Sequence, residues 1–111
     1  MILKPFSTGS LFQVMERTLL SMNAIVTASS DQVSSKLGDE VVILNLRNGV
    51  YYGLDPVGAR IWELIQEPRS VQEVCAVLLE EYEVTLEQCA SDVLALLRDL
   101  EAQGLIEVRG V

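Results

Sequence analysis

Two cysteines and sixteen carboxylates are the side chains of this 111-residue chain with the chemistry to catalyse or to bind a metal, and histidine is absent. Cys75 and Cys89 fall on separate predicted helices, whereas a zinc site needs more ligands at closer spacing. Without histidine the commonest general base is missing, and no nucleophile stands beside another base. We therefore expect buried structural thiols, no metal or other cofactor, and a protein that is not an enzyme.

The charge of the chain limits its partners. Eight lysines and arginines against sixteen aspartates and glutamates give a net charge of −8, which repels phosphate backbones and argues against nucleic-acid binding. No apolar run approaches the roughly 18 residues of a membrane span, and the N-terminus lacks the apolar core and cleavage site of a secretory signal. We expect a cytoplasmic protein, without a membrane partner, that favours a basic or apolar ligand.

The most informative stretch runs from Leu46 to Leu64. Its Asn48-Gly49 pair lies between two apolar runs and predicts a two-residue type I′ hairpin turn, followed by a strand over Val50–Leu54. The pair Asp55-Pro56 then opens a helix, because aspartate caps a helix and proline suits its first position. The sequence predicts a hairpin that leads directly into a helix.

The spacing of apolar residues predicts the elements that must hold this stretch. Ser70 with Glu73, and Thr85 with Gln88, have the pattern of capping boxes at helix starts. The expected elements are the strands Ile25–Thr27, Val33–Leu37, Val41–Arg47 and Val50–Leu54, the helices Pro56–Gln66, Ser70–Glu83 and Thr85–Gln103, and a last short strand or packed tail at Leu105–Val108. Strands followed by helices indicate an α+β fold with a small antiparallel three-stranded sheet and three helices.

Neither face of the predicted hairpin is clearly polar. Pairing across a two-residue turn sets Leu46 opposite Tyr51 and Leu44 opposite Gly53. One face then carries Val42, Leu44, Leu46 and Tyr51, and the other carries Val41, Ile43, Asn45, Tyr52 and Leu54. The count of apolar residues favours the first face as the core face, whereas Leu54, just before the helix, favours the second, so both remain open.

Residues 1–31 give the weakest pattern and are interpreted as an N-terminal extension. Leu11–Met22 has apolar residues at roughly helical spacing, which is consistent with a short helix. A disordered or loosely packed segment is the alternative, because termini are ordered only when something ties them down. Met22 is also a possible start of translation. The folded domain is expected to span residues 32–109.

A binding role fits these features better than catalysis. If Val50–Leu54 is the last strand of the sheet, its outer edge offers backbone groups to another extended chain. Side-chain pockets must add to the backbone bonds, and Leu94, beside the core-facing stripe of the last helix, is a candidate wall. The structural alternative is a short solvated edge and an isolated exposed leucine.

The run Asn48–Leu64, with Asn-Gly followed by Tyr-Tyr-Gly-Leu-Asp-Pro-Val-Gly-Ala-Arg-Ile-Trp, resembles the signature of the PqqD-like family, and the similarity extends over Val33–Val108. Asp55 departs from the asparagine frequent in that family, although either residue caps a helix. The resemblance implies a winged-helix-like, non-catalytic domain that binds the leader segment of a ribosomally made precursor peptide. It implies that the leader adds as a strand to the third strand and lies against the third helix.

Mapped onto this chain, the resemblance places the peptide along the strand of Val50, Tyr51, Tyr52, Gly53 and Leu54. Helix geometry adds a wall from Ala90 to Glu101, in which we single out the positions Asp92, Leu94, Leu97 and Glu101. The favoured partner enzyme is a separate leader peptidase working with a cyclase, as in lasso-peptide clusters. The alternative is a radical SAM enzyme served by a pyrroloquinoline quinone accessory protein.

Two rival functions come from other classes. A winged-helix transcription factor would use a similar arrangement, but the last helix carries mainly acidic residues, the wrong sign for phosphates. A protein-interaction or regulatory module would bury a flat surface and tolerate changes at the strand edge. The exposed edge also permits a monomer or a weak dimer.

Overall fold

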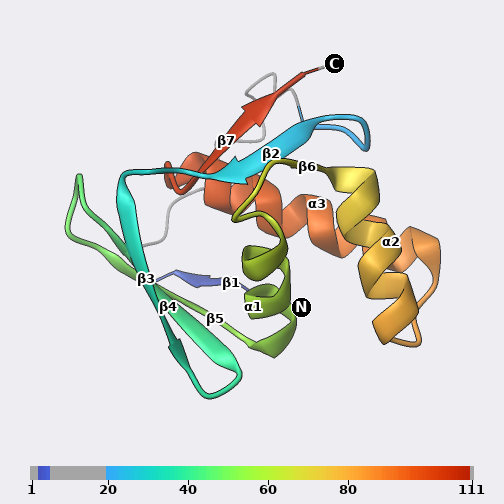
Figure 1. Ribbon diagram of the computed structural model, residues 1–111, viewed down its shortest axis with the longest axis horizontal. Helices are drawn as coiled ribbons and strands as arrows, with labels where there is room; N and C mark the ends of the chain where they lie inside the picture. The colour runs from blue at the N-terminus through green and yellow to red at the C-terminus, as the bar shows by residue number, and fades with distance from the viewer. Residues whose placement is uncertain (1–2, 6–19, 111) are drawn as a thin grey trace.

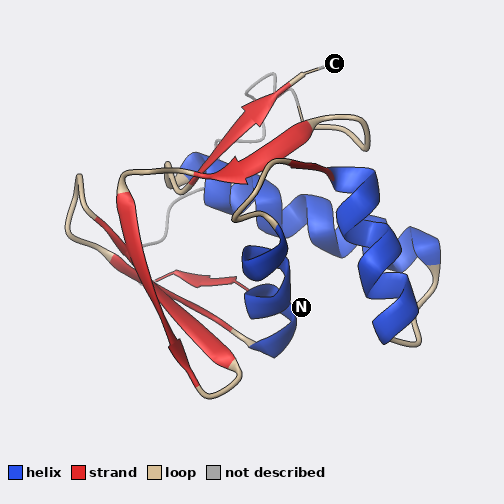
Figure 2. Cartoon of the chain, in the orientation of Figure 1, coloured by secondary structure: helices blue, strands red, loops and turns tan. Residues whose placement is uncertain are grey.

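The structure is a computed structural model that describes residues 3–5 and 20–110. Two small antiparallel sheets lie beside three helices in this part of the chain (Figures 1 and 2). In chain order the elements are β1 (Leu3–Pro5), β2 (Ile25–Ala28), β3 (Gln32–Leu37), β4 (Glu40–Asn45), β5 (Tyr51–Leu54), α1 (Pro56–Leu64), β6 (Arg69–Ser70), α2 (Val71–Glu81), α3 (Leu86–Ala102) and β7 (Ile106–Arg109). The predicted α+β class is confirmed.

The larger sheet, sheet A, has the strand order β1-β5-β4-β3, and the smaller, sheet B, has the order β6-β2-β7. The predicted three-stranded sheet is present as β3, β4 and β5, and β1 adds a fourth strand beside β5. The sequence pattern does not predict sheet B as a separate sheet. Its central strand β2 pairs with β7 from the other end of the chain, with Val26 opposite Val108.

The hairpin of β4 and β5 differs from the prediction in its turn. Tyr51 lies opposite Leu44, whereas the predicted register placed Gly53 there, so the pairing is shifted by two residues. The cause is a four-residue loop, in which the Asn45 carbonyl accepts a hydrogen bond from the Gly49 N–H at 2.8 Å. Gly49 alone in this loop has a positive φ, 72°, whereas a type I′ turn needs two such residues. A shift of two residues leaves every side chain on its predicted face.

The core face of sheet A is the one that carries Tyr52 and Leu54. Their side chains are buried, whereas Tyr51 on the other face is 51% exposed. Because α1 starts two residues after β5, it covers this face, and its Ile61 and Trp62 are buried in the same core. The sequence left this choice open, and the position of the helix decides it.

The helix starts follow the predicted chemistry. Asp55 caps α1 by accepting a hydrogen bond from the N–H three residues on, at 2.8 Å. Ser70 and Glu73 form a complete capping box at α2. Thr85 accepts from the Gln88 N–H at 3.1 Å, but the Gln88 side chain donates to a residue in the next helical turn, so only half of the second box forms. These caps fix where each helix begins.

The folded unit begins before the predicted boundary at residue 32. Leu20, Ala24 and Val26 are buried in the same core as the helices. The chain before residue 32 therefore supplies both core residues and the central strand of sheet B. The helix expected over Leu11–Met22 falls mostly on residues outside those described.

Asn45 is a buried polar residue that joins two parts of the fold. Its Nδ2 donates to the carbonyl of Gln103 at 2.7 Å, and its Oδ1 accepts from the Arg47 N–H at 2.8 Å. We expect Asn45→Ala to lower the free energy of unfolding by about 2 kcal/mol, because a buried side chain loses its bonds to the backbone of Gln103, Arg47 and Asn48. Urea denaturation measures this loss. Asn48→Ala removes one exposed bond at the same loop and should cost less than about 1 kcal/mol; equal losses would contradict the anchoring role of Asn45.

The two cysteines are buried, as predicted, and are free thiols. Burial raises the pKa of the Cys75 thiol from 9.0 to about 12 and also raises the pKa of Cys89. Because the unfolded chain loses the Cys75 proton at lower pH than the folded chain, stability is retained below about pH 9 and falls as the pH rises toward 12. We expect Cys75→Ala to lose less stability than the unmodified chain between pH 8 and pH 10.5 in thermal melts. An identical loss of stability in both chains would contradict a contribution of the buried Cys75 thiol to this pH dependence.

Candidate peptide-binding surface

Strand β5 presents two residues on the outer face of sheet A. It lies between β4 and β1 and is antiparallel to both. Tyr52 and Leu54 point into the core, whereas Tyr51 is exposed and a Cβ added at Gly53 would meet open space. Of the five strand residues predicted to bind a peptide, Tyr52 and Leu54 can therefore contact a partner only through their backbone.

The backbone of β5 alternates between its two neighbours. The Asn45 N–H donates to the Val50 carbonyl at 2.9 Å, and hydrogen-bonded pairs recur at every second residue of an antiparallel ladder. The bonding groups of Tyr52 therefore face β4, and those of Tyr51 and Gly53 face away from it. Tyr51 and Gly53 are thus the β5 residues whose backbone groups can bond a strand on the side away from β4.

Two hydrogen bonds tie the end of α3 to this hairpin. The Tyr52 hydroxyl donates to Oε1 of Gln103 at 2.6 Å, and Asn45 donates to the carbonyl of the same residue. With about 100° per residue, positions seven or eleven apart share one side of a helix. Asp92, Asp99 and Gln103 have this spacing, and we call them the sheet-facing flank of α3.

A small hollow supports this placement of the flank. Asp92 lines a cavity of about 130 Å³ together with Val57, near the start of α1, and Leu78 of α2. Since α1 follows β5 directly, the flank of α3 that carries Asp92 looks toward the end of β5. An acidic helix surface thus lies on the same side of α3 as the link to β5.

The structure does not bring the four predicted α3 residues together. Leu94 and Glu101 are seven residues apart and share one flank, but each lies about 160–180° around the helix from Asp92. Leu97 has no exposed surface and packs in the core. Only Asp92 of the four is on the sheet-facing flank, because the core-facing stripe separates it from Leu94 and Glu101.

Asp99 and Gln103 lie on the sheet-facing flank, and the sequence interpretation did not single them out. Partial burial raises the pKa of the Asp99 carboxyl, and Gln103 orders Tyr52. Asp92 is itself held by a hydrogen bond from Nε2 of Gln88 at 2.9 Å. The spacing of seven and four residues from Asp92 to Asp99 to Gln103 is the signal that could have identified this flank.

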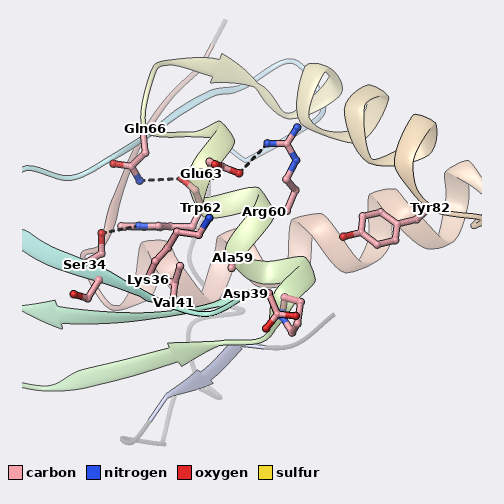
Figure 3. A pocket seen from close by; sticks show the side chains of 12 residues that line it. Ser34, Lys36, Asp39, Val41, Ala59, Arg60, Trp62, Glu63, Gln66 and Tyr82 are labelled. Atoms are coloured by element: carbon pink, nitrogen blue, oxygen red, sulfur yellow. Dashed lines mark hydrogen bonds and ion pairs between the residues drawn. The ribbon is translucent and has the colours of Figure 1, made fainter.

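A larger hollow of about 520 Å³ lies elsewhere, between the β3–β4 hairpin and α1 (Figure 3). Trp62 on its wall donates from Nε1 to Oγ of Ser34 at 3.1 Å. Arg60 forms ion pairs with Glu63 at 2.9 Å and with Glu81 at 2.8 Å, and its hydrogen bond to Glu81 lowers the pKa of that carboxyl. None of the β5 residues lines this hollow, so it is separate from the strand edge.

The described residues contain neither a cluster of metal ligands nor a helix that could span a membrane. In residues 3–5 and 20–110, no three His, Cys, Asp or Glu side chains are grouped to hold a metal ion. The helices in this part of the chain are too short or too polar to cross a bilayer. On the side away from β4, strand β5 is paired with the three residues of β1, and Tyr52 of β5 is bonded to the sheet-facing flank of α3.

This arrangement defines a class: a small α+β domain with a strand edge and a helix flank that can accommodate an extended peptide. Residues 40–106, which are 67 of the 111 residues, match the family described as coenzyme PQQ synthesis protein D, PqqD. The chain belongs to the PqqD family. The family resemblance seen in the sequence is confirmed.

A solved structure supports the same assignment. The chain is similar to TbiB1, whose structure is described as a complex with the TbiA(beta) leader peptide. The two are 38% identical, with a TM-score of 0.70, and the match covers 73% of this chain and 94% of that one. No curated protein matches the chain significantly.

Proposed function

We propose that this chain is a non-catalytic protein that captures the leader segment of a ribosomally made precursor peptide. The leader adds as a strand to β5, beside the sheet-facing flank of α3, and is delivered to a separate maturation enzyme. The observation that carries this proposal is the similarity to TbiB1, which is solved with a leader peptide bound. A cytoplasmic location and a monomeric or weakly dimeric state belong to the same proposal.

The outer face of sheet A offers the side-chain contacts that backbone bonds alone cannot replace. Val33, Leu44 and Tyr51 lie opposite one another across β3, β4 and β5, and Val33 and Tyr51 are more than half exposed. A strand added to β5 would extend this row by one residue. We therefore expect an apolar leader side chain next to Tyr51, since cross-strand apolar pairs stabilise a sheet.

Two maturation enzymes fit this role. The leader peptidase with its cyclase is favoured by the likeness to a protein that binds a leader peptide. A radical SAM enzyme of pyrroloquinoline quinone synthesis is the alternative, which the description of the matched family supports. Identifying the precursor peptide that this chain binds would distinguish between the two enzymes.

A fluorescence-polarisation titration tests the proposal. The probes are the labelled TbiA(beta) leader peptide and labelled leader segments of precursor peptides encoded beside this chain's gene. Saturable binding with a dissociation constant of about 1 μM or lower, in line with a specific peptide complex, is the expected result. A folded chain that binds none of the probes would overturn the proposal and favour a protein-interaction module.

The charge on the sheet-facing flank should affect binding of a basic leader. We expect Asp92→Asn to weaken the binding of such a leader about two- to fivefold, because an exposed ion pair contributes up to about 1 kcal/mol. Glu101→Gln makes the same charge change on the opposite flank of α3 and should have little effect. The same titration at low salt measures both. A larger effect at Glu101 would move the site to the flank of Leu94 and Glu101.

A further inference from the structure

The edge of β5 already has a strand beside it. β1 pairs antiparallel with β5, with Leu3 opposite Leu54, Lys4 opposite Gly53 and Pro5 opposite Tyr52. Figure 1 shows β1, in blue, next to β5. This is the edge to which the proposed leader strand would add. We propose that residues 3–5 are a built-in occupant of the leader site, which an arriving leader must displace; this inference rests on the proposed function.

The register gives the occupant one hydrogen-bonded pair. Because the bonding groups of Gly53 face away from β4, Lys4 and Gly53 form the pair that exchanges both backbone hydrogen bonds. Pro5 lies opposite Tyr52 in a non-hydrogen-bonded pair. The N–H of a residue at this position would face away from β5, so proline loses no bond to β5 by lacking it. Proline is therefore compatible with this strand, and it leaves no donor there for a further strand.

The occupant is short enough to be displaced. A leader segment that covers all of β5 can bond both Tyr51 and Gly53, whereas residues 3–5 bond Gly53 alone in the described part of the chain. Two ordinary hydrogen bonds contribute about 2 kcal/mol, and closing the connecting chain of about 14 residues costs a similar amount, so the closing constant is on the order of 1. The closed and open forms should thus be similarly populated in the free protein, and closure should lower the apparent affinity for leader about twofold.

The matched family region does not contain this strand. The family match covers residues 40–106, so β1 lies outside it. A leader peptide would meet the part of the chain that matches the family together with a competing strand from outside it. The covalent link makes this competition intramolecular, so protein concentration should not change it.

The test uses the full chain with proline placed at either of two neighbouring positions. Lys4→Pro removes the N–H that faces Gly53, whereas Leu3→Pro removes one that faces away, so the second variant is the matched control. We expect Lys4→Pro to lower the exchange protection of the Gly53 amide about twofold and to tighten binding of the TbiA(beta) leader peptide about twofold. Leu3→Pro should change neither. Unchanged protection of the Ile43 amide shows that both variants are folded.

A disulfide staple provides the converse measurement. Gly53 has open space where a Cβ would lie, and directly opposed strand residues are within disulfide reach. In the Lys4→Cys/Gly53→Cys variant, oxidation should abolish leader binding and dithiothreitol should restore it. Full leader affinity in the oxidised variant would overturn the inference. So would Gly53 protection that disappears on dilution, because the strand would then come from a second copy.

The two proposals fail in different ways. If no leader probe binds any variant, the proposed function fails and the occupant has no leader site to block, even when Gly53 protection follows the proline positions. If the leader binds all variants with equal affinity and Gly53 protection does not respond to Lys4→Pro, the proposed function stands and the occupant is rejected.

Discussion

Replacing Gly53 with proline in the Lys4→Pro chain, in which residues 3–5 no longer compete for β5, is expected to weaken leader-peptide binding at least about tenfold in a protein that still folds. The Gly53 N–H faces away from β4, so its loss removes a bond to an added strand and leaves the β4–β5 ladder intact. The proline ring also occupies the space that the incoming backbone needs. One lost backbone bond together with this steric conflict corresponds to about 1.4 kcal/mol or more, which is tenfold in affinity.

Gly53→Ala is the matched control for this result. It retains the N–H, and its added Cβ meets open space, so binding should change less than about threefold. Polarisation titrations of both variants with the same leader probe make the comparison. Proline at Tyr52 is unsuitable, because the bonding groups of that residue face β4 and its side chain is buried. Equal affinity of the Lys4→Pro chain with and without Gly53→Pro would contradict strand addition at β5.

Leu97→Ala is expected to lower the free energy of unfolding by about 2–5 kcal/mol. The side chain is fully buried in the core, and truncating a buried leucine costs both its burial and a cavity. A domain of this size has only about 5–15 kcal/mol of total stability, so the loss is a large fraction of it. Urea denaturation measures the change.

Leu94→Ala is the control on the same helix. Leu94 is partly buried and packs at the margin of the core, so its truncation should cost less than that of Leu97. If Leu97→Ala left stability unchanged and weakened peptide binding instead, Leu97 would be a contact residue, as the sequence interpretation had it, and its placement in the core would be wrong.

The sequence predicts the fold best where its signals are local. Asp55, Ser70 and Thr85 mark helix starts through bonds to residues three positions away, and each is visible in the sequence. The hairpin turn was predicted incorrectly because Asn45 closes a four-residue loop with its own carbonyl. Neither the Asn-Gly pair nor the alternation of apolar residues reveals that bond, because a register shift of two residues preserves the face of every side chain.

The candidate site was predicted only in part, because the contacts that complete it join residues far apart in the sequence. The β5 edge follows from the hairpin, but its pairing with β1 joins residues about fifty positions apart and has no local signal. On α3, the apolar stripe identified the core, yet it does not reveal which flank faces β5. That choice depends on the bond between Tyr52 and Gln103, which forms only in the folded chain.

The most direct test of strand addition is amide hydrogen exchange of the isotope-labelled chain, with and without saturating leader peptide. Leader binding along β5 should slow exchange of the Tyr51 and Gly53 amides at least about tenfold and leave Tyr52, already paired with β4, nearly unchanged. Saturated binding with no added protection at Tyr51 and Gly53, or with new protection along β3 instead, would contradict a leader site at the edge of β5.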